Sequence, residues 1–134
     1  MAGEEYKRDA KEWDYSKTWY HGSPVRLNTI SKGSTITQDR DIARVFSHKP
    51  HRVSLGDGTI KHDGVEPGFL YRIAEDIGPD DVYPHPRSSM EWGEEWLTSR
   101  VLRVLLIGPV EIRDEERLTR EEIAWLEEKL KSRD

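Results

Sequence analysis

The sequence contains no cysteine, so disulfide bonds and thiolate metal sites are excluded. The absence fits a reducing compartment, and we expect a cytoplasmic protein. No apolar run approaches the roughly 20 residues that a membrane-spanning helix needs. Residues 1–14 are charged and lack the apolar core of a signal peptide. The sequence therefore predicts a soluble protein without a membrane partner.

The chain also has no excess of positive charge. Its 21 basic and 26 acidic residues give a net charge of -5. This balance argues against a protein that binds nucleic acid by bulk attraction to phosphates. A small anionic ligand held by one or two arginines remains compatible with it.

Several common catalytic motifs are missing. The chain has no Gly-x-Gly-x-x-Gly, P-loop or Gly-x-Ser-x-Gly sequence, so dehydrogenase, kinase and serine hydrolase functions lack support. His48 and His51 have a spacing at which two histidines can share a metal ion. Pro50 breaks any helix between them, however, and no carboxylate completes a known ligand spacing. We therefore predict no metal site.

The length of 134 residues suits a single domain. Five tryptophans and five tyrosines offer large apolar surfaces for its core. Residues 1–17 form a polar arm, whose end Trp13 and Tyr15 could pin onto the domain. Residues 18–134 are expected to form that domain.

Short runs of β-forming residues alternate with turn signals along this domain. They predict strands at residues 18–21, 33–37, 52–55, 69–74, 95–97 and 101–107. Pro109 is expected to break the last one, with a possible continuation of the sheet at residues 110–112. Residues 56–58, Gly-Asp-Gly, favour a hairpin turn, whereas residues 24–31 and 78–93 are expected to be a connector and a long loop.

Two helices complete the prediction. Asp39 can cap a short helix at residues 40–47. Thr119 and Glu122 form a capping box for a C-terminal helix that we expect to pack on the domain. The pattern predicts an α+β fold with a mostly antiparallel or split β-sheet, short helices and a C-terminal helix.

Residues 20–23, Tyr-His-Gly-Ser, lie where the first predicted strand ends. His21 is polar and needs a partner at this junction, and a ligand is one natural candidate. Gly22 allows a close approach of another backbone or of a ligand. Ser23 adds a hydroxyl group and an amide. This motif is the first candidate for a binding site.

The order of these segments resembles the ADP-ribosyltransferase superfamily. Its members open with a strand that ends in His-Gly-Thr or His-Gly-Ser, as residues 20–23 do. A second strand and a short helix with an alanine and an aromatic residue follow, like residues 33–37 and 43–46. A late glutamate stands before an aromatic-aliphatic pair, like residues 94–97, Glu-Glu-Trp-Leu.

Within that superfamily the chain looks most like the small bacterial rifamycin ADP-ribosyltransferases. They share the early Tyr-His-Gly, a Gly-aromatic-aliphatic-Tyr strand (residues 68–71 here) and an acidic loop with Gly-Pro (residues 77–81). Residues 102–104 also resemble their late strand. The resemblance covers about residues 18–112 and implies an ADP-ribosyltransferase-like split sheet.

The resemblance implies NAD as co-substrate, with ADP-ribose passing to an unknown small-molecule or protein acceptor and nicotinamide released. Cleavage of the glycosidic bond builds positive charge on the ribose, which a nearby carboxylate stabilises. Glu95 is the first candidate for this carboxylate, and Asp80 or Asp81 is the alternative. His21 would bond a ribose hydroxyl. The expected NAD contacts are Tyr20, His21, Gly22, Ser23, Thr35, Thr37 and Tyr71, and Arg26 or Arg44 could meet the pyrophosphate.

The second strand departs from the histidine-type pattern. Thr35 stands where a tyrosine is usual, and residues 34–37, Ser-Thr-Ile-Thr, resemble the serine-threonine-serine version of another branch. This difference leaves open a non-catalytic module of the same fold that binds a nucleotide or a protein. An RNA 2'-phosphotransferase-like enzyme is a third possibility, against which the acidic net charge argues.

Overall fold

A computed structural model describes residues 13–56, 59–88, 90 and 92–131 of the chain. Within these residues it contains nine β-strands and two α-helices, so the fold is mixed α+β, as predicted. The centre of the predicted turn, residues 57–58, and most of the predicted N-terminal arm lie outside the described residues. No helix in the described residues combines the length and the apolar character needed to cross a bilayer.

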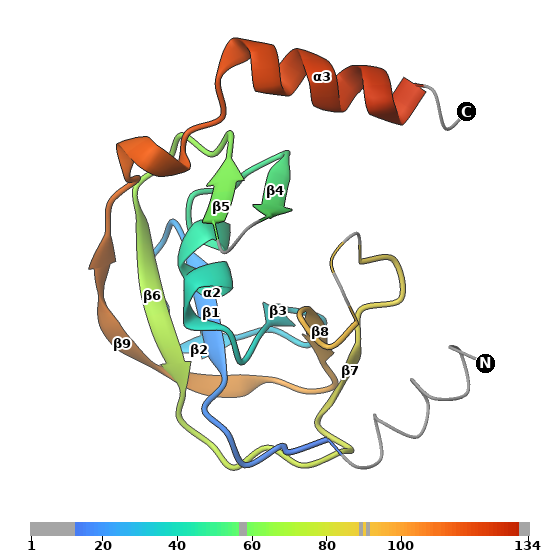
Figure 1. The fold of residues 1–134 in the computed structure, drawn as a ribbon. Coiled ribbons are helices and arrows are strands. Elements are labelled where there is room, and N and C mark those ends of the chain that lie inside the picture. Colours follow the sequence, from blue (N-terminus) through green and yellow to red (C-terminus); the bar gives the residue numbers. More distant parts are fainter. Residues whose placement is uncertain (1–12, 57–58, 89, 91, 132–134) are drawn as a thin grey trace, which may run out of the picture.

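A curled antiparallel sheet forms one side of the molecule (Figure 1). Its order is β1 (Tyr20–Ser23), β6 (Gly68–Ile73), β9 (Leu102–Val110) and β2 (Thr29–Ile30). The register of β6 against β9 shifts between Leu70 and Tyr71, and such a bulge bends a strand. The long strands β6 and β9 thus curve into a half-barrel around helix α2.

Strand β9 corrects the prediction that Pro109 breaks the last apolar run. Pro109 pairs with Phe69, and the strand continues to Val110. The proline lies one residue before the end of the strand and close to the bulge, where the missing amide donor is tolerated. The predicted strand at residues 101–107 is otherwise confirmed in an inner position of the sheet.

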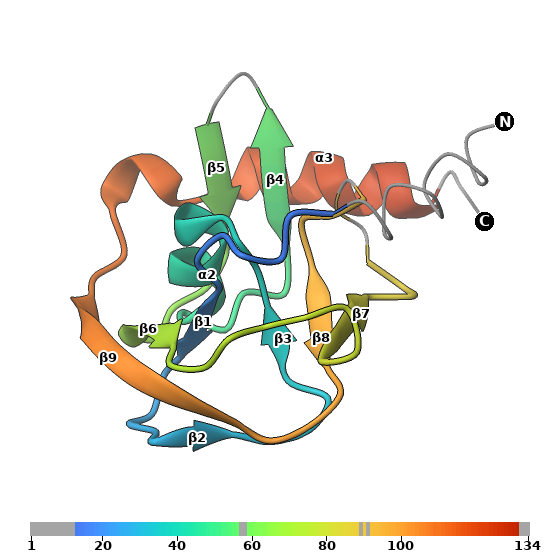
Figure 2. The same ribbon diagram turned by 90° about the horizontal axis from the view of Figure 1, so that it is seen from below.

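A second antiparallel sheet has the order β3 (Thr35–Ile36), β8 (Trp96–Thr98) and β7 (Val82–Pro84). Strand β7 lies inside the predicted long loop, and β2 lies inside the predicted connector. Both strands are too short to show a period in the sequence. Two backbone hydrogen bonds between Tyr20 and Thr37, of 2.7 and 3.0 Å, join the two sheets. Figure 2 shows β3, β8 and β7 side by side.

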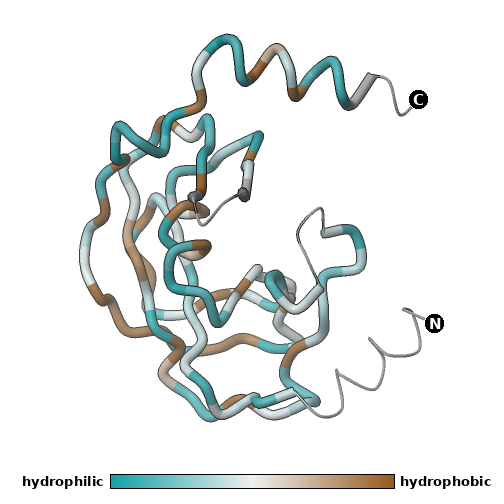
Figure 3. Tube along the Cα trace, in the orientation of Figure 1, coloured by the Kyte–Doolittle hydropathy of each residue, from teal (hydrophilic) through white to brown (hydrophobic). Residues whose placement is uncertain are grey.

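An aromatic cluster fills the core beside the second sheet. Trp96 is fully buried, and the ring centroids of Trp13, Tyr15, Trp19 and Trp92 all lie within 5.9 Å of its own. Four of the five tryptophans therefore meet in one place. Brown, hydrophobic segments alternate with teal, hydrophilic ones along the curled sheet and along α3 (Figure 3). Trp13 and Tyr15 pack against the domain as predicted.

Helix α2 (Arg40–Phe46) lies inside the half-barrel and begins as predicted. The Asp39 carboxylate accepts hydrogen bonds from the amides of Asp41 (2.9 Å) and Ile42 (3.2 Å). The helix packs so closely on β1 that a Cβ atom on Gly22 would lie 1.9 Å from the carbonyl oxygen of Ala43. Gly22 therefore serves helix packing, whatever else it contacts.

The remaining elements form a separate layer above α2 (Figure 1). Strands β4 (Val53–Gly56) and β5 (Thr59–His62) pair as the predicted hairpin, and the 3-10 helix η1 (Asp114–Glu116) leads into α3 (Arg120–Lys131). The predicted capping box is present, with both of its hydrogen bonds 3.1 Å long. Ion pairs connect α3 to the hairpin region: Lys61–Glu122 at 3.1 Å and Arg52–Glu127 at 2.6 Å.

We expect Gly22→Ala to destabilise the protein by about 2 kcal/mol or more, because the added methyl group must push α2 away from β1. Urea denaturation measures this change. Gly108→Ala is the matched control, since nothing lies within 4 Å of its new Cβ atom. Equal stability of the two variants would contradict the close packing of α2 on β1.

Candidate functional site

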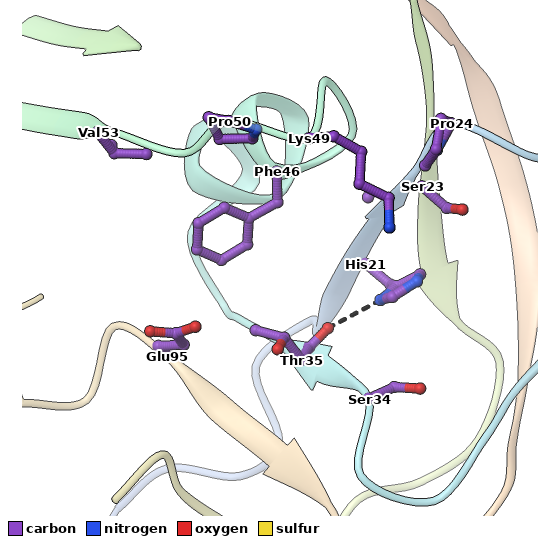
Figure 4. Close-up of a pocket in the computed structure, with 11 residues that line it drawn as sticks. His21, Ser23, Pro24, Ser34, Thr35, Phe46, Lys49, Pro50, Val53 and Glu95 are labelled. Carbon is purple, nitrogen blue, oxygen red and sulfur yellow. Dashed lines mark hydrogen bonds between the residues drawn. The ribbon is translucent and has the colours of Figure 1, made fainter. Parts of the chain in front are cut away.

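A cleft of about 390 Å³ opens between the two sheets and the end of α2 (Figure 4). Strand β1 contributes His21, Gly22 and Ser23 to its wall, and β3 contributes Thr35. Further lining residues come from α2 and the segment after it, from β4, and from the position just before β8, namely Phe46, Lys49, Pro50, Val53 and Glu95. The cleft thus gathers residues from four separate stretches of the sequence.

His21 is the second residue of β1, not the end of a strand as predicted, because β1 continues to Ser23. Its Nδ1 atom lies 2.8 Å from the carbonyl oxygen of Thr35. A carbonyl can only accept, so Nδ1 carries the proton and the neutral ring keeps a lone pair on Nε2. This tautomer suits a ligand that donates a hydrogen bond from a hydroxyl group.

The pKa of His21 is lowered, chiefly by burial. The hydrogen bond to Thr35 acts in the opposite direction, and the positive charge of Lys49 lowers the pKa further. The imidazole is therefore neutral at pH 7, which keeps Nε2 as an acceptor.

Glu95 comes directly before β8 and faces the cleft. Side chains alternate along an extended chain, so the burial of Trp96 in the core turns Glu95 to the opposite side. The Ser88 hydroxyl donates a 2.6 Å hydrogen bond to Glu95 Oε1. The carboxylate is thereby oriented and stands across the cleft from His21 (Figure 4).

Lys49 follows α2 and has a left-handed backbone, with φ of 55°. Its amide donates to the carbonyl oxygen of Phe46 at 3.1 Å, and Pro50 prevents the helix from continuing. The side chain extends toward His21 (Figure 4). Of the described residues that line the cleft, Lys49 supplies the cationic side chain, and the sequence analysis missed it.

Other predicted NAD contacts do not line the cleft. Tyr71 is buried; its hydroxyl donates to the carbonyl oxygen of Val25 and accepts from the amide of Leu27, both at 2.8 Å. Thr37 is also buried, and Tyr20 pairs with it through the backbone. The structure thus gives these three residues structural roles beside the cleft.

The alternative carboxylate lies elsewhere. Asp81 accepts hydrogen bonds from Arg100 Nε and from the amide of Gly78, both at 2.8 Å. The bond from Arg100, followed by that from Gly78, lowers the pKa of Asp81. Asp81 therefore stabilises the loop in which it lies. Asp80, in the same turn, is exposed. Between Glu95 and these aspartates, Glu95 lines the cleft.

The two arginines considered for a pyrophosphate are also outside the cleft. Arg44 is buried in an ion pair with Glu116, and the Arg26 guanidinium lies 5.3 Å from the centre of the Phe69 ring. His48 is buried and His51 is exposed. The described residues contain no group of three or more histidine or acidic side chains that could hold a metal ion.

Comparison of the chain with protein-family models, with curated proteins and with solved structures gave no match.

We expect His21 to titrate below its ordinary value of 6.5, and Lys49→Gln to raise its pKa because a nearby positive charge is removed. An NMR titration of the imidazole signals measures both. Lys32→Gln is the control, since Lys32 is exposed and does not line the cleft. An unchanged His21 pKa in Lys49→Gln would show that the two side chains do not interact.

Proposed function

We propose that the protein is an NAD-dependent ADP-ribosyltransferase that passes ADP-ribose to an acceptor and releases nicotinamide. In the same proposal, the two antiparallel sheets are the split sheet of that superfamily. The observation that carries the proposal is that His21 and Glu95, the histidine and the glutamate of the sequence motifs, line one cleft. Its volume falls in the range of about 300–1,000 Å³ that is common for ligand sites.

The side chains of the cleft fit the parts of NAD. The lone pair on His21 Nε2 can accept a hydrogen bond from a ribose hydroxyl. Phe46 offers an aromatic surface, and the Lys49 ammonium offers a positive charge to the pyrophosphate. In this proposal Lys49, rather than Arg26 or Arg44, contacts the pyrophosphate.

The reaction breaks the bond between ribose C1' and the nicotinamide nitrogen, and the bonding electrons leave with nicotinamide. Positive charge then develops on the ribose, where the Glu95 carboxylate stabilises it. The acceptor attacks C1' and loses its proton, which Glu95 can take and return to solvent. Water can serve as the acceptor when no other is present, so nicotinamide release reports the reaction.

We expect Glu95→Gln to slow nicotinamide release from NAD by about 100-fold or more, because an amide can neither stabilise the charge nor take the proton. Its affinity for NAD should change little, since the shape of the side chain is kept. Asp81→Asn is the matched control and should change the rate by less than about twofold, because its partner Arg100 is exposed at the surface. Chromatography of released nicotinamide measures the rates.

Three other outcomes are informative. A folded wild-type protein that neither releases nicotinamide nor shows a thermal shift with NAD refutes the proposal. Loss of activity in Asp81→Asn but not in Glu95→Gln assigns the carboxylate to the acidic loop. Binding of NAD without turnover, unchanged in Glu95→Gln, supports the non-catalytic nucleotide-binding module.

We expect Lys49→Gln to weaken NAD binding by about tenfold, because a hydrogen bond to a charged group is lost. Binding of nicotinamide riboside should be unaffected, since it has no pyrophosphate. Calorimetric titration with both ligands measures the difference. An equal loss of affinity for both would contradict the contact between Lys49 and the pyrophosphate.

A further inference from the structure

We propose that Glu116 is a positioning residue for the cleft, although it does not line it. Its buried ion pair with Arg44 holds the end of α2 in place. Phe46, Lys49 and Pro50 reach the cleft from this end of the helix. The effect of these three residues on ligand binding rests on the proposed function. The link between Glu116 and the position of the helix end does not.

The ion pair is buried and bidentate. Both guanidinium nitrogens Nη1 and Nη2 of Arg44 donate to the two carboxylate oxygens of Glu116, and the Nη1–Oε2 distance is 2.9 Å. The two side chains are only 8% and 5% exposed. Breaking such a pair from one side leaves a buried charge without compensation, which is strongly destabilising. Arg44 belongs to α2 and Glu116 to η1, so the pair joins the helix to the segment after β9.

Two buried histidines lie next to this ion pair, on the side of the β4–β5 hairpin, and form one cluster with it. His62 Nε2 lies 3.5 Å from Glu116 Oε2, and the ring of His48 stacks on that of His62 with centroids 5.5 Å apart. The amide of Leu118 donates to the carbonyl oxygen of His62 at 3.0 Å, which fixes η1 against β5. The cluster therefore connects α2, β5 and η1.

Glycines allow other backbone segments to lie very close to the end of α2. A Cβ atom on Gly68 would lie 2.1 Å from Ser47 Oγ, and one on Gly64 would lie 2.7 Å from the carbonyl oxygen of His48. Together with Gly22 below Ala43, three backbones approach the last turn of α2 without side chains between them. While Glu116 holds the end of α2 against these backbone segments, the helix end has little freedom to move. The left-handed turn at Lys49 is therefore restrained as well.

The charged surroundings make the link sensitive to acid. The groups that face it are Asp41, Arg44, His48, His62, Arg113, Glu116 and Arg117. Burial lowers the pKa of His48 and of His62 below 6.5, so the stability that their neutral forms provide is lost as the pH falls below 6.5. Burial alone would raise the pKa of Glu116, but Arg44 outweighs it and lowers this pKa, so its contribution is lost below pH 4.5. Both effects therefore lower the stability of the folded state on acidification.

The experiment uses the full chain with Glu116→Gln, which keeps the shape and removes the charge. At pH 7 we expect amide hydrogen exchange in α2 and η1 to accelerate about tenfold more than in β6, because the opening is local. The pKa of His21 should rise, since the displaced Lys49 ammonium no longer lowers it. Glu115→Gln, an exposed neighbour in the same 3-10 helix, is the control and should change neither quantity.

Equal acceleration in α2 and β6 with an unchanged His21 pKa would overturn the proposal, since Glu116 would then serve general stability alone. If Glu116→Gln does not fold, Arg44→Lys replaces it, since this variant keeps the positive charge but loses the bidentate contact. The same hydrogen exchange and His21 pKa are then measured, and smaller shifts are expected. Neither readout requires NAD. If the wild-type protein does not bind NAD while Glu116→Gln shows these shifts, the proposed function is refuted and the positioning role stays intact.

Discussion

Helix α2 lies so close to strand β1 that the site between them depends on the missing side chain of Gly22. A short helix packed on the inside of a curled sheet brings its last turn next to the middle of the first strand. Phe46 and Lys49 thereby line the same cleft as His21, and the Lys49 side chain extends toward His21 (Figure 4). The capping carboxylate of Asp39 fixes where the helix begins, and the ion pair of Arg44 with Glu116 holds its other end.

The aromatic cluster around Trp96 supports the opposite side of the cleft, where Glu95 lies. Burial of this indole fixes β8, and the alternation of side chains then turns Glu95 into the cleft. Trp19 is buried in the same cluster, one residue before β1. Burial of Trp96 thus positions one of the two polar groups that the proposed chemistry uses. The core and the cleft are linked here, because neighbouring residues of one extended segment place one side chain in each.

Two sets of ionisable groups lie next to α2. In the cleft, His21 is kept neutral by burial and by Lys49, so it is suited to accept a hydrogen bond. Behind α2, Arg44 and Glu116 satisfy one another away from water, next to two histidines that burial keeps neutral. The last turn of α2 and the residues that follow it up to Lys49 join the two sets along the chain. A change of charge behind the helix is therefore transmitted to the cleft through backbone geometry.

The sequence by itself determined the elements with strong local signals. Capping residues marked both helices, alternating or apolar runs marked most strands, and the His-Gly-Ser and Glu-Trp motifs marked His21 and Glu95. It could not find β2 and β7, since strands of two or three residues form only where a neighbour offers its hydrogen bonds. Nor could it separate Glu95 from Asp81, or Lys49 from Arg26 and Arg44, because charged side chains of one sign look alike until the fold is known. Only the tertiary structure decided which of these residues line the cleft. Arg44 is buried in an ion pair with Glu116, Asp81 is paired with Arg100, and the left-handed turn after α2 directs Lys49 toward His21.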